Sequence, residues 1–287
     1  MSSSPESPFS SVAIVGLGLI GGSIALGVRD RWPSTRLFGV DTDAVLAHVL
    51  GSGAIDRAAG SLDAVPDAAL VILAAPVVQN IKLLGQVAAL PGTRVVTDVG
   101  GTKHDIVEVA RSLPSGVSFV GGHPLAGGER GGFAFARPDL FEGRPWIFTP
   151  DGATSADAVE RLSRFVSGLG ARPTLIGVEE HDRLMAYVSH LPQLTASALM
   201  ETVGAAVHAD GLRMAGRGLA DTTRLASSPA SVWRDICATN ADAIGDALDS
   251  LISRLTRMRA DLRQGEDVDR VLTAAASWRA ELIKERD

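Results

Sequence analysis

Residues 12–22 read VAIVGLGLIGG, a short apolar run that leads directly into a cluster of glycines. A run of Val and Ile bounded by glycine is typical of a buried strand, and the stretch Ile20–Arg29 after it is long enough for a helix. The glycines thus form a G-x-G-x-x-G turn, made by Gly16, Gly18 and Gly21. In such a turn the first glycine bends the chain, the second lets a pyrophosphate approach, and the third lets helix and strand pack closely. The motif therefore predicts a dinucleotide site at the helix start, with Leu19 and Ile20 beside the phosphates.

Asp41 supports the same prediction. It ends a second apolar run, Leu37–Val40, and lies 20 residues after Gly21. A carboxylate at this place accepts hydrogen bonds from the adenosine ribose hydroxyls and repels a 2′-phosphate, so NAD is favoured over NADP. The alternative is that Asp41 is only a turn or N-cap residue before a helix starting near Asp43.

The first half of the chain alternates apolar runs with helical stretches. The expected strands are Val12–Val15, Leu37–Val40, Leu70–Ala74, Arg94–Asp98 and Val117–Gly121, with Pro145–Thr149 and Pro173–Ile176 as possible additions to the sheet. The expected helices between them include Ile20–Arg29, Gln79–Leu90 and Ala156–Leu169. This alternation predicts an α/β fold, a Rossmann-like, mostly parallel sheet with helices on both faces.

From Val178 onward the pattern is helical only. One stripe at helical spacing carries Pro192 as an expected kink, and comprises Leu184, Tyr187, Val188, Leu191, Thr195, Ala198 and Leu199. A second comprises Ile244, Leu248, Leu251, Leu255, Met258 and Leu262, and suits either packing within the chain or a helix–helix dimer seam. We therefore expect a loose tail over 1–11, an NAD-binding domain over 12–177 and an all-α substrate and dimerisation domain over 178–287.

Composition excludes several classes of protein. The 287 residues are 46% hydrophobic and carry a net charge of −6 with no long run of Lys or Arg, which argues against a nucleic-acid partner. The single cysteine, Cys237, excludes an internal disulfide and fits a reducing compartment. No Cys/His cluster has metal-ligand spacing, so no metal is expected. No apolar stretch reaches the roughly 20 residues that span a bilayer, so we expect no membrane contact and a cytoplasmic location.

Four later segments narrow the chemistry. They read TDVGGTKHDIV at 97–107, GGHPLAGGERGGFAFARPDLFEGR at 121–144, EEHDRLMAYVSHLPQ at 179–193 and GRGLADTTRLASSPASVWRDI at 216–236. Together with VGLGLIGGS, these blocks resemble the prephenate dehydrogenase family, which includes arogenate dehydrogenases. The resemblance covers nearly the whole chain, and the blocks follow the family's order.

The resemblance implies an NAD-dependent oxidative decarboxylation of a cyclohexadienol in tyrosine biosynthesis. Prephenate would yield 4-hydroxyphenylpyruvate; arogenate, or a related substrate of a specialised pathway, is the alternative. His123 matches the family's catalytic histidine, which accepts a hydrogen bond from the substrate hydroxyl, a task that suits a neutral imidazole. Arg224 matches an arginine that binds a substrate carboxylate through paired hydrogen bonds. Without the family, His123 reads as a turn residue and Arg224 as the partner of a surface ion pair with Asp221.

The resemblance also assigns the remaining site residues. Glu129 matches a residue at the mouth of the site, and Trp233 matches a tryptophan that can reach a partner subunit's site in a homodimer, or else packs in the core. The other expected substrate-binding residues are Ser189, His190, Gln193 and Asp221. The other expected cofactor-binding residues are Ala75, Pro76, Asp98 and Gly101.

Three positions depart from the family pattern near this site. Gly101 stands where a serine is usual, Gly128 where a serine or threonine precedes the glutamate, and Gln193 where a second histidine follows SHLP. These changes can shift the preference among prephenate, arogenate and amino-substituted relatives, or be neutral if water or Thr102 replaces the missing hydroxyl. The chain offers no stretch for a mutase or regulatory domain, so feedback by tyrosine is expected, if anywhere, at the active site.

Two other functions compete with this interpretation. A β-hydroxyacid dehydrogenase also joins a Rossmann-like domain to helices, but it needs a catalytic lysine on the first long helix of the second part. No lysine lies between Glu179 and Gly211. A redox sensor that binds NAD without turnover would bind NADH but consume no cyclohexadienol, and the joint match of His123 and Arg224 argues against it.

Overall fold

The computed structural model describes residues 6–65, 68–128 and 130–284. These residues fall into two compact units, one that ends at Ala241 and one that begins at Asp242.

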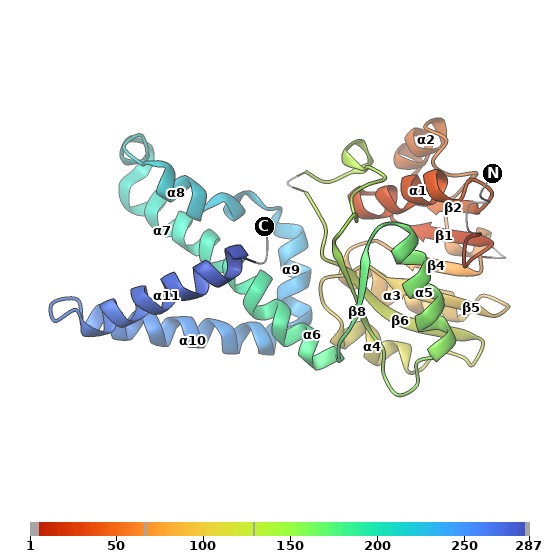
Figure 1. The fold of residues 1–287 in the computed structure, drawn as a ribbon. Coiled ribbons are helices and arrows are strands. Elements are labelled where there is room, and N and C mark those ends of the chain that lie inside the picture. The colour runs from red at the N-terminus through yellow and green to blue at the C-terminus, as the bar shows by residue number, and fades with distance from the viewer. Residues whose placement is uncertain (1–5, 66–67, 129, 285–287) are drawn as a thin grey trace. The chain divides into compact units, whose positions relative to one another are not determined.

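An eight-stranded sheet forms the centre of the first unit, in the order β3-β2-β1-β4-β5-β6-β7-β8 (Figure 1). Neighbouring strands are parallel except β6 and β7, which are antiparallel. The strands are β1 (Ser11–Val15), β2 (Arg36–Val40), β3 (Arg57–Ala59), β4 (Leu70–Leu73), β5 (Arg94–Asp98), β6 (Val117–Pro124), β7 (Pro145–Thr149) and β8 (Arg172–Leu175). The expected Rossmann-like α/β class is confirmed, followed by a helical region in the residues that the structure describes.

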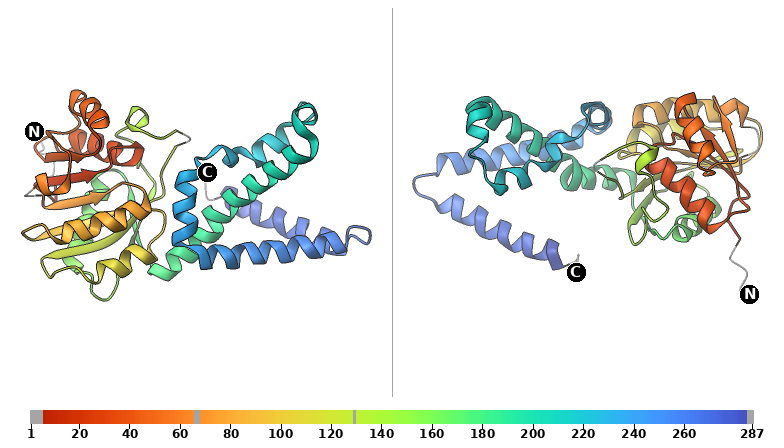
Figure 2. Two further views of the ribbon diagram at one scale, coloured as in Figure 1. Left: turned by 180° about the vertical axis from the view of Figure 1, so that it is seen from behind. Right: turned by 90° about the horizontal axis from the view of Figure 1, so that it is seen from above.

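Helices cover both faces of this sheet (Figure 2). The helices here are α1 (Leu19–Arg31), α2 (Asp43–Gly51), α3 (Val77–Ala88), α4 (His104–Ala110) and α5 (Ala156–Gly168), with short turns η1 (Leu62–Ala64) and η2 (Phe133–Phe135). One core, which includes Ile14, Ile24 and Phe165, packs α1, α2 and α5 on one face. The other, which includes Leu84 and Ile106, packs α3 and α4 on the opposite face. Burial on both faces explains why the strands are continuous Val, Ile and Leu runs.

The prediction of a loose tail through residue 11 is wrong for its last residues; residues 1–5 lie outside the described part. Phe9 is fully buried and meets the ring of Phe165 edge-on at 5.8 Å. The guanidinium of Arg161 lies over the Phe9 ring, 4.4 Å from the ring centroid. Ser11 already belongs to β1. One aromatic side chain therefore anchors a segment whose polar composition predicted disorder.

Helices follow the sheet in the remainder of the first unit. They are α6 (Val178–Met185), the π-turn η3 (Ala186–His190), α7 (Leu191–Leu212), α8 (Arg217–Thr222), the 3₁₀ turn η4 (Arg224–Ser227) and α9 (Ala230–Thr239). The expected kink at Pro192 takes the form of this π-turn, because proline lacks the N–H of a regular helix and its ring crowds the preceding turn.

The face of α6 and η3 that is buried is not the apolar stripe. Val188 is 59% exposed and Tyr187 45%, whereas His181, Asp182 and His190 are buried. The buried side of α6 and η3 therefore combines these three polar residues with Met185 and Ala186, whereas Leu184, Tyr187 and Val188 of the apolar stripe are exposed.

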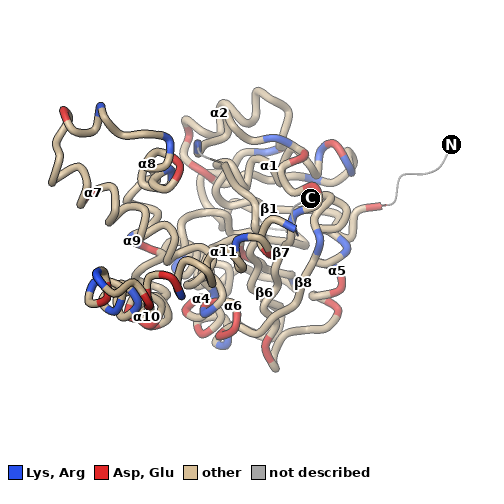
Figure 3. Tube along the Cα trace, turned by 60° about the vertical axis from the view of Figure 1, so that its left-hand side comes forward, with Lys and Arg blue, Asp and Glu red and all other residues tan. Residues whose placement is uncertain are grey.

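The second unit consists of two helices, α10 (Ala241–Ala260) and α11 (Glu266–Lys284), which are joined by a turn. Asp242 lies in the first turn of α10, and Arg257 and Arg259 lie in its last turn, an arrangement that suits the helix dipole. Figure 3 colours the acidic and basic residues along the chain. The apolar stripe of α10 is only partly covered within the chain, since Leu255 is 54% exposed. On α11, Trp278 is 75% exposed. Among the described helices, none is long and apolar enough to cross a membrane.

Candidate active site

The three fingerprint glycines lie between β1 and α1, and each meets different surroundings. Gly16 has φ +93°, and a Cβ there would lie 2.6 Å from the carbonyl oxygen of Ala74. A Cβ on Gly21 would lie 1.9 Å from the carbonyl oxygen of Gly16. A Cβ on Gly18 would meet no atom within 4 Å, so its backbone is open. Two glycines thus serve the fold, and the third leaves room for a ligand.

Asp41 ties the end of β2 to this loop. Its carboxylate accepts the N–H of Leu17 at 2.7 Å and the N–H of Thr42 at 2.7 Å. The N-cap of α2 is Thr42 rather than Asp41. Each carboxylate oxygen accepts one backbone hydrogen bond and keeps a further lone pair for a ligand.

A hollow of about 690 Å³ lies beside these groups. Its lining includes Gly16, Gly18, Asp41, Ala75 and Pro76. It lies at the carboxyl ends of β1, β2 and β4, at the point where the chain order of the strands reverses on either side of β1. Ligands of such sheets bind at this place. Open glycine, carboxylate and hollow together fit the adenosine and pyrophosphate of NAD. Leu19 and Ile20, which are partly exposed, form the first turn of α1.

Asp98 and Lys103 form a buried ion pair after β5. The same carboxylate accepts the N–H of Gly100 at 2.8 Å and that of Gly122 at 3.1 Å. Burial lowers the pKa of Lys103, and the charge of Asp98 offsets part of this effect. Asp98 therefore holds the loop 99–103 against β6, and its carboxylate is engaged with protein groups rather than open to a cofactor.

His123 lies at the carboxyl end of β6, next to that loop. Its Nδ1 lies 2.9 Å from Nε2 of His181, and Nδ1 of His181 lies 2.7 Å from a carboxylate oxygen of Asp182. Burial, and then the neighbouring His181, Lys103 and His190, lower the pKa of His123 well below its usual range. His123 is therefore a neutral imidazole near pH 7, able to accept a proton or hydrogen bond.

Gly101 leaves space beside this imidazole. A Cβ at Gly101 would lie 4.0 Å from Nε2 of His123 and 3.9 Å from Cδ1 of Ile236. Thr102 does not replace the missing hydroxyl, because its Oγ1 is hydrogen-bonded to Thr239 at 2.8 Å. The Nε2 side of His123 thus borders the position that a serine hydroxyl would otherwise occupy.

Gln193 is buried and anchors the turn η4. Its amide nitrogen donates to the carbonyl of Leu225 at 2.8 Å, and its amide oxygen accepts the hydroxyl of Ser228 at 3.1 Å. Arg224 is exposed at the first position of that turn, and Asp221 is exposed on α8. The residue that departs from the family pattern therefore positions the segment that carries Arg224.

The remaining predicted residues are divided between the site and the surface. His190 is buried, burial lowers its pKa to about 4, and Asn240 lies 3.3 Å from its Nδ1. Trp233 meets the ring of His190 edge-on at 6.0 Å, while Ser189 is exposed. A Cβ on Gly128 would lie 3.5 Å from Cδ2 of Leu19. Glu129 lies outside the described residues.

The structure adds His181, Asp182 and Lys103 to the site, none of which was predicted as a site residue. Asp182 accepts the backbone N–H groups of Lys103 and His104, both at 2.8 Å. The adjacent His and Asp in EEHDR were the available signal. Their partner, His123, lies 58 residues earlier, and only the fold reveals the contact.

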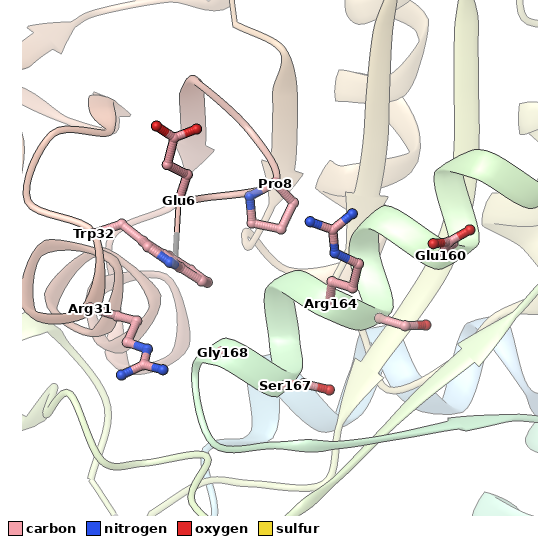
Figure 4. A pocket seen from close by; sticks show the side chains of 9 residues that line it. Glu6, Pro8, Arg31, Trp32, Glu160, Arg164, Ser167 and Gly168 are labelled. Carbon is pink, nitrogen blue, oxygen red and sulfur yellow. The ribbon is translucent and has the colours of Figure 1, made fainter. Parts of the chain in front are cut away.

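A second hollow lies elsewhere, between the end of α1 and α5 (Figure 4). Arg31 and Arg164 line it together with Glu6 and Glu160. The last turn of α1 lies at the edge where the parallel strands begin, away from the fingerprint, and the mixed charge favours no phosphate. Among the described residues no group of His, Cys, Asp and Glu could hold a metal ion.

Known proteins are similar to this chain in sequence and in fold. Residues 24–175 match the family description "Prephenate dehydrogenase, nucleotide-binding domain", and residues 177–274 match "Prephenate dehydrogenase, dimerization domain". A prephenate dehydrogenase of Bacillus subtilis is 37% identical over 281 residues, which are 94% of this chain and 75% of that protein.

Two solved structures are similar along almost the full chain. A prephenate dehydrogenase of A. aeolicus, in complex with hydroxyphenyl propionate and NAD+, has a TM-score of 0.87 and 28% identity, covering 98% of this chain and 100% of that one. The arogenate dehydrogenase of Synechocystis has a TM-score of 0.81 and 27% identity, covering 95% and 99%. From both domain matches and the extent of these alignments, this chain belongs to the prephenate dehydrogenase family.

Proposed function

We propose that this NAD-dependent dehydrogenase converts prephenate to 4-hydroxyphenylpyruvate and carbon dioxide, a step of tyrosine biosynthesis. The observation that carries the proposal is the neutral His123 at the carboxyl edge of a sheet whose fingerprint loop fits NAD. Family membership gives the reaction class, and the site supplies the base that the reaction needs.

NAD would be held by the loop of Gly16, Gly18 and Gly21, by Asp41, and by the walls at Ala75 and Pro76. When bound, NAD supplies the acceptor for the hydride that leaves the ring carbon bearing the hydroxyl. The first turn of α1 contributes backbone N–H groups for the pyrophosphate. The Asp41 carboxylate binds the ribose hydroxyls and disfavours the 2′-phosphate of NADP.

His123 accepts the proton of the substrate hydroxyl at Nε2 while hydride leaves the same carbon. Carbon dioxide then departs from the opposite ring carbon, its bonding electrons complete the aromatic ring, and the proton returns to the phenolate oxygen. The balance is one hydride and one carbon dioxide lost from prephenate with no net proton. Arg224 binds a substrate carboxylate, and Glu129, Ser189, His190, Asp221 and Trp233 contribute to the substrate side of the site.

We also place a functional boundary at Gly177 and Val178, a proposal supported by the two separate domain matches. The chain forms a homodimer through its helical part. The exposed apolar side chains Tyr187, Val188, Leu255 and Trp278, and the match to a dimerisation domain, support this assembly. Exposed apolar patches of this kind are typical of interfaces.

The test is NADH formation from prephenate and from arogenate, each offered with NAD and with NADP, with carbon dioxide release measured in parallel. We expect turnover of prephenate with NAD and at least a tenfold preference for NAD over NADP, about 1.4 kcal/mol. Turnover of arogenate alone would show that arogenate, rather than prephenate, is the substrate. Turnover of neither, with NADH binding intact, would contradict the proposal.

A further inference from the structure

We propose that His181 and Asp182 are positioning residues that fix His123 in the tautomer with hydrogen on Nδ1, leaving the Nε2 lone pair for substrate. This inference rests on the proposed function and deepens it, because it names the groups that prepare the base. Neither residue touches the reacting atoms; both act through His123.

The chain of hydrogen bonds starts at Asp182, whose carboxylate is held as an acceptor. Burial alone would raise its pKa, but hydrogen bonds from His181, His104 and Lys103 outweigh that effect and lower it. Its backbone carbonyl also accepts Nδ2–H of Asn240 at 2.9 Å. An ionised, immobile carboxylate 2.7 Å from Nδ1 of His181 requires hydrogen on that nitrogen.

A neutral His181 with hydrogen on Nδ1 has its lone pair on Nε2. That lone pair lies 2.9 Å from Nδ1 of His123, which must therefore donate. The reverse direction would require an imidazolium at His181, with hydrogen on both nitrogens. Among the described residues, the groups whose charge acts on His123 are His181, His190 and the buried Lys103, and the cation of Lys103 opposes a positive charge on His123.

On the opposite side of His123, position 101 carries no side chain that could do the same work. Gly101 stands where the family usually has serine, and it has no hydroxyl to offer to Nε2, which would lie 4.0 Å from a Cβ at this position. Thr102 is bonded to Thr239. The tautomer in this chain is therefore set from the Nδ1 side, by the bond that the other ring nitrogen makes.

The arrangement also supports the transfer itself. When Nε2 takes the substrate proton, the imidazolium of His123 keeps its Nδ1–H bond to His181. The negative charge of Asp182 lies directly behind that bond and stabilises the transient cation. The proton returns to the phenolate when the ring becomes aromatic, so the three side chains end in their starting state.

The test is the tautomer of His123, read from imidazole ¹⁵N shifts of the ¹⁵N-histidine-labelled full-length protein. The chain has six histidines, and the signal lost in His123→Asn assigns the one in question. We expect a protonated Nδ1 and an unprotonated Nε2 in the wild type. In His181→Leu, which has no acceptor, we expect that preference to be lost. In His181→Gln, whose amide can donate to Asp182 and accept from His123, we expect it to be kept.

Kinetics provide the second readout. We expect kcat/KM for prephenate to fall about 100-fold in His181→Leu and to stay within about tenfold of wild type in His181→Gln, with KM for NAD unchanged. His48→Leu is the matched control, because His48 is an exposed histidine on α2 that takes no part in this chain of hydrogen bonds, and it should change neither readout.

A wild-type His123 with hydrogen on Nε2, or a His181→Leu enzyme with wild-type tautomer and kcat/KM, would overturn the inference. If His181→Leu does not fold, the wild-type and His181→Gln spectra still decide it. The spectra need no substrate. An enzyme that turns over no cyclohexadienol but shows the expected tautomer would therefore contradict the proposed function and leave the positioning role standing.

Discussion

Gly18 and Gly21 are three residues apart, yet an added methyl group should impair NADH binding at Gly18 and folding of the loop at Gly21. We expect Gly21→Ala to prevent the native loop, because its Cβ would lie 1.9 Å from the Gly16 carbonyl oxygen. The free energy of unfolding of Gly18→Ala should lie within about 0.5 kcal/mol of the wild-type value, since the added Cβ meets no atom within 4 Å. The same methyl group should weaken NADH binding at least tenfold, because it occupies the approach of the pyrophosphate.

Thermal unfolding and NADH fluorescence titration of the two variants check this expectation. Each variant is the control for the other, since both add one methyl group to the same loop. NADH affinity of Gly18→Ala equal to wild type, or a stable Gly21→Ala, would show that the fingerprint does not act as described.

Side chains close together in sequence could be predicted, and those far apart could not. The glycines and Asp41 follow a contiguous β-α-β pattern whose geometry is local. His123 and Arg224 were predicted through resemblance, and their roles remain predictions. The contact of His123 with His181 depends on packing between a strand and a helix 58 residues later, which no spacing rule encodes.

At the scale of elements, buried strands were predicted well because they are uniform apolar runs. The expected Arg94–Asp98 and Pro145–Thr149 coincide with β5 and β7. The edge strand β3 was missed, since its sequence RAA has no strand signature and its pairing to β2 alone defines it. The π-turn was predicted only as a kink. The stripe beginning at Leu184 was found, but the sequence could not tell whether it faced the chain or a partner.

The hydrogen bonds from Gln193 on α7 to the turn η4 give a prediction at the scale of elements. We expect Gln193→Ala to lower the free energy of unfolding by about 1–3 kcal/mol, because the buried carbonyl of Leu225 loses its donor. We also expect KM for prephenate to rise while NADH affinity stays unchanged, since η4 carries Arg224. Chemical denaturation and steady-state kinetics measure both effects. Gln264→Ala, the same change at an exposed position, is the control. Unchanged KM in Gln193→Ala would separate η4 from substrate binding.

For the molecule as a whole, the buried histidines should make the folded protein less stable at acid pH. Burial lowers the pKa of His190 from 6.5 to about 4, and that of His123 also falls. Between pH 6.5 and pH 4 the histidines of the unfolded chain bind protons that the same histidines of the folded protein do not. The free energy of unfolding therefore has its full value above pH 6.5 and decreases as the pH falls towards 4. Asp182, with its lowered pKa, adds a loss only below its ordinary 3.8.

Urea unfolding at a series of pH values from 7 to 4 measures the slope of the free energy of unfolding against pH. We expect His190→Gln to flatten it and the exposed-site control His104→Gln to leave it unchanged. Equal slopes in wild type and His190→Gln would mean that His190 titrates normally in the folded protein.

Assembly is the other property of the whole molecule that can be tested. We expect Trp278→Glu to convert a dimer to a monomer in sedimentation, because it puts a charge on the exposed apolar face of α11. Thr273→Glu adds the same charge at an exposed position of the same helix and should leave the dimer intact. A dimeric Trp278→Glu would place the interface elsewhere.

The most direct test of the central claim compares wild type with His123→Asn in NADH formation from prephenate and NAD. We expect steady turnover by the wild type and a loss of about 1,000-fold in kcat/KM for the variant, because Asn cannot take the hydroxyl proton. NADH affinity and thermal unfolding should be unchanged. A variant as active as wild type would remove His123 from the chemistry, and a wild type without turnover would contradict the assignment of this chain as a prephenate dehydrogenase.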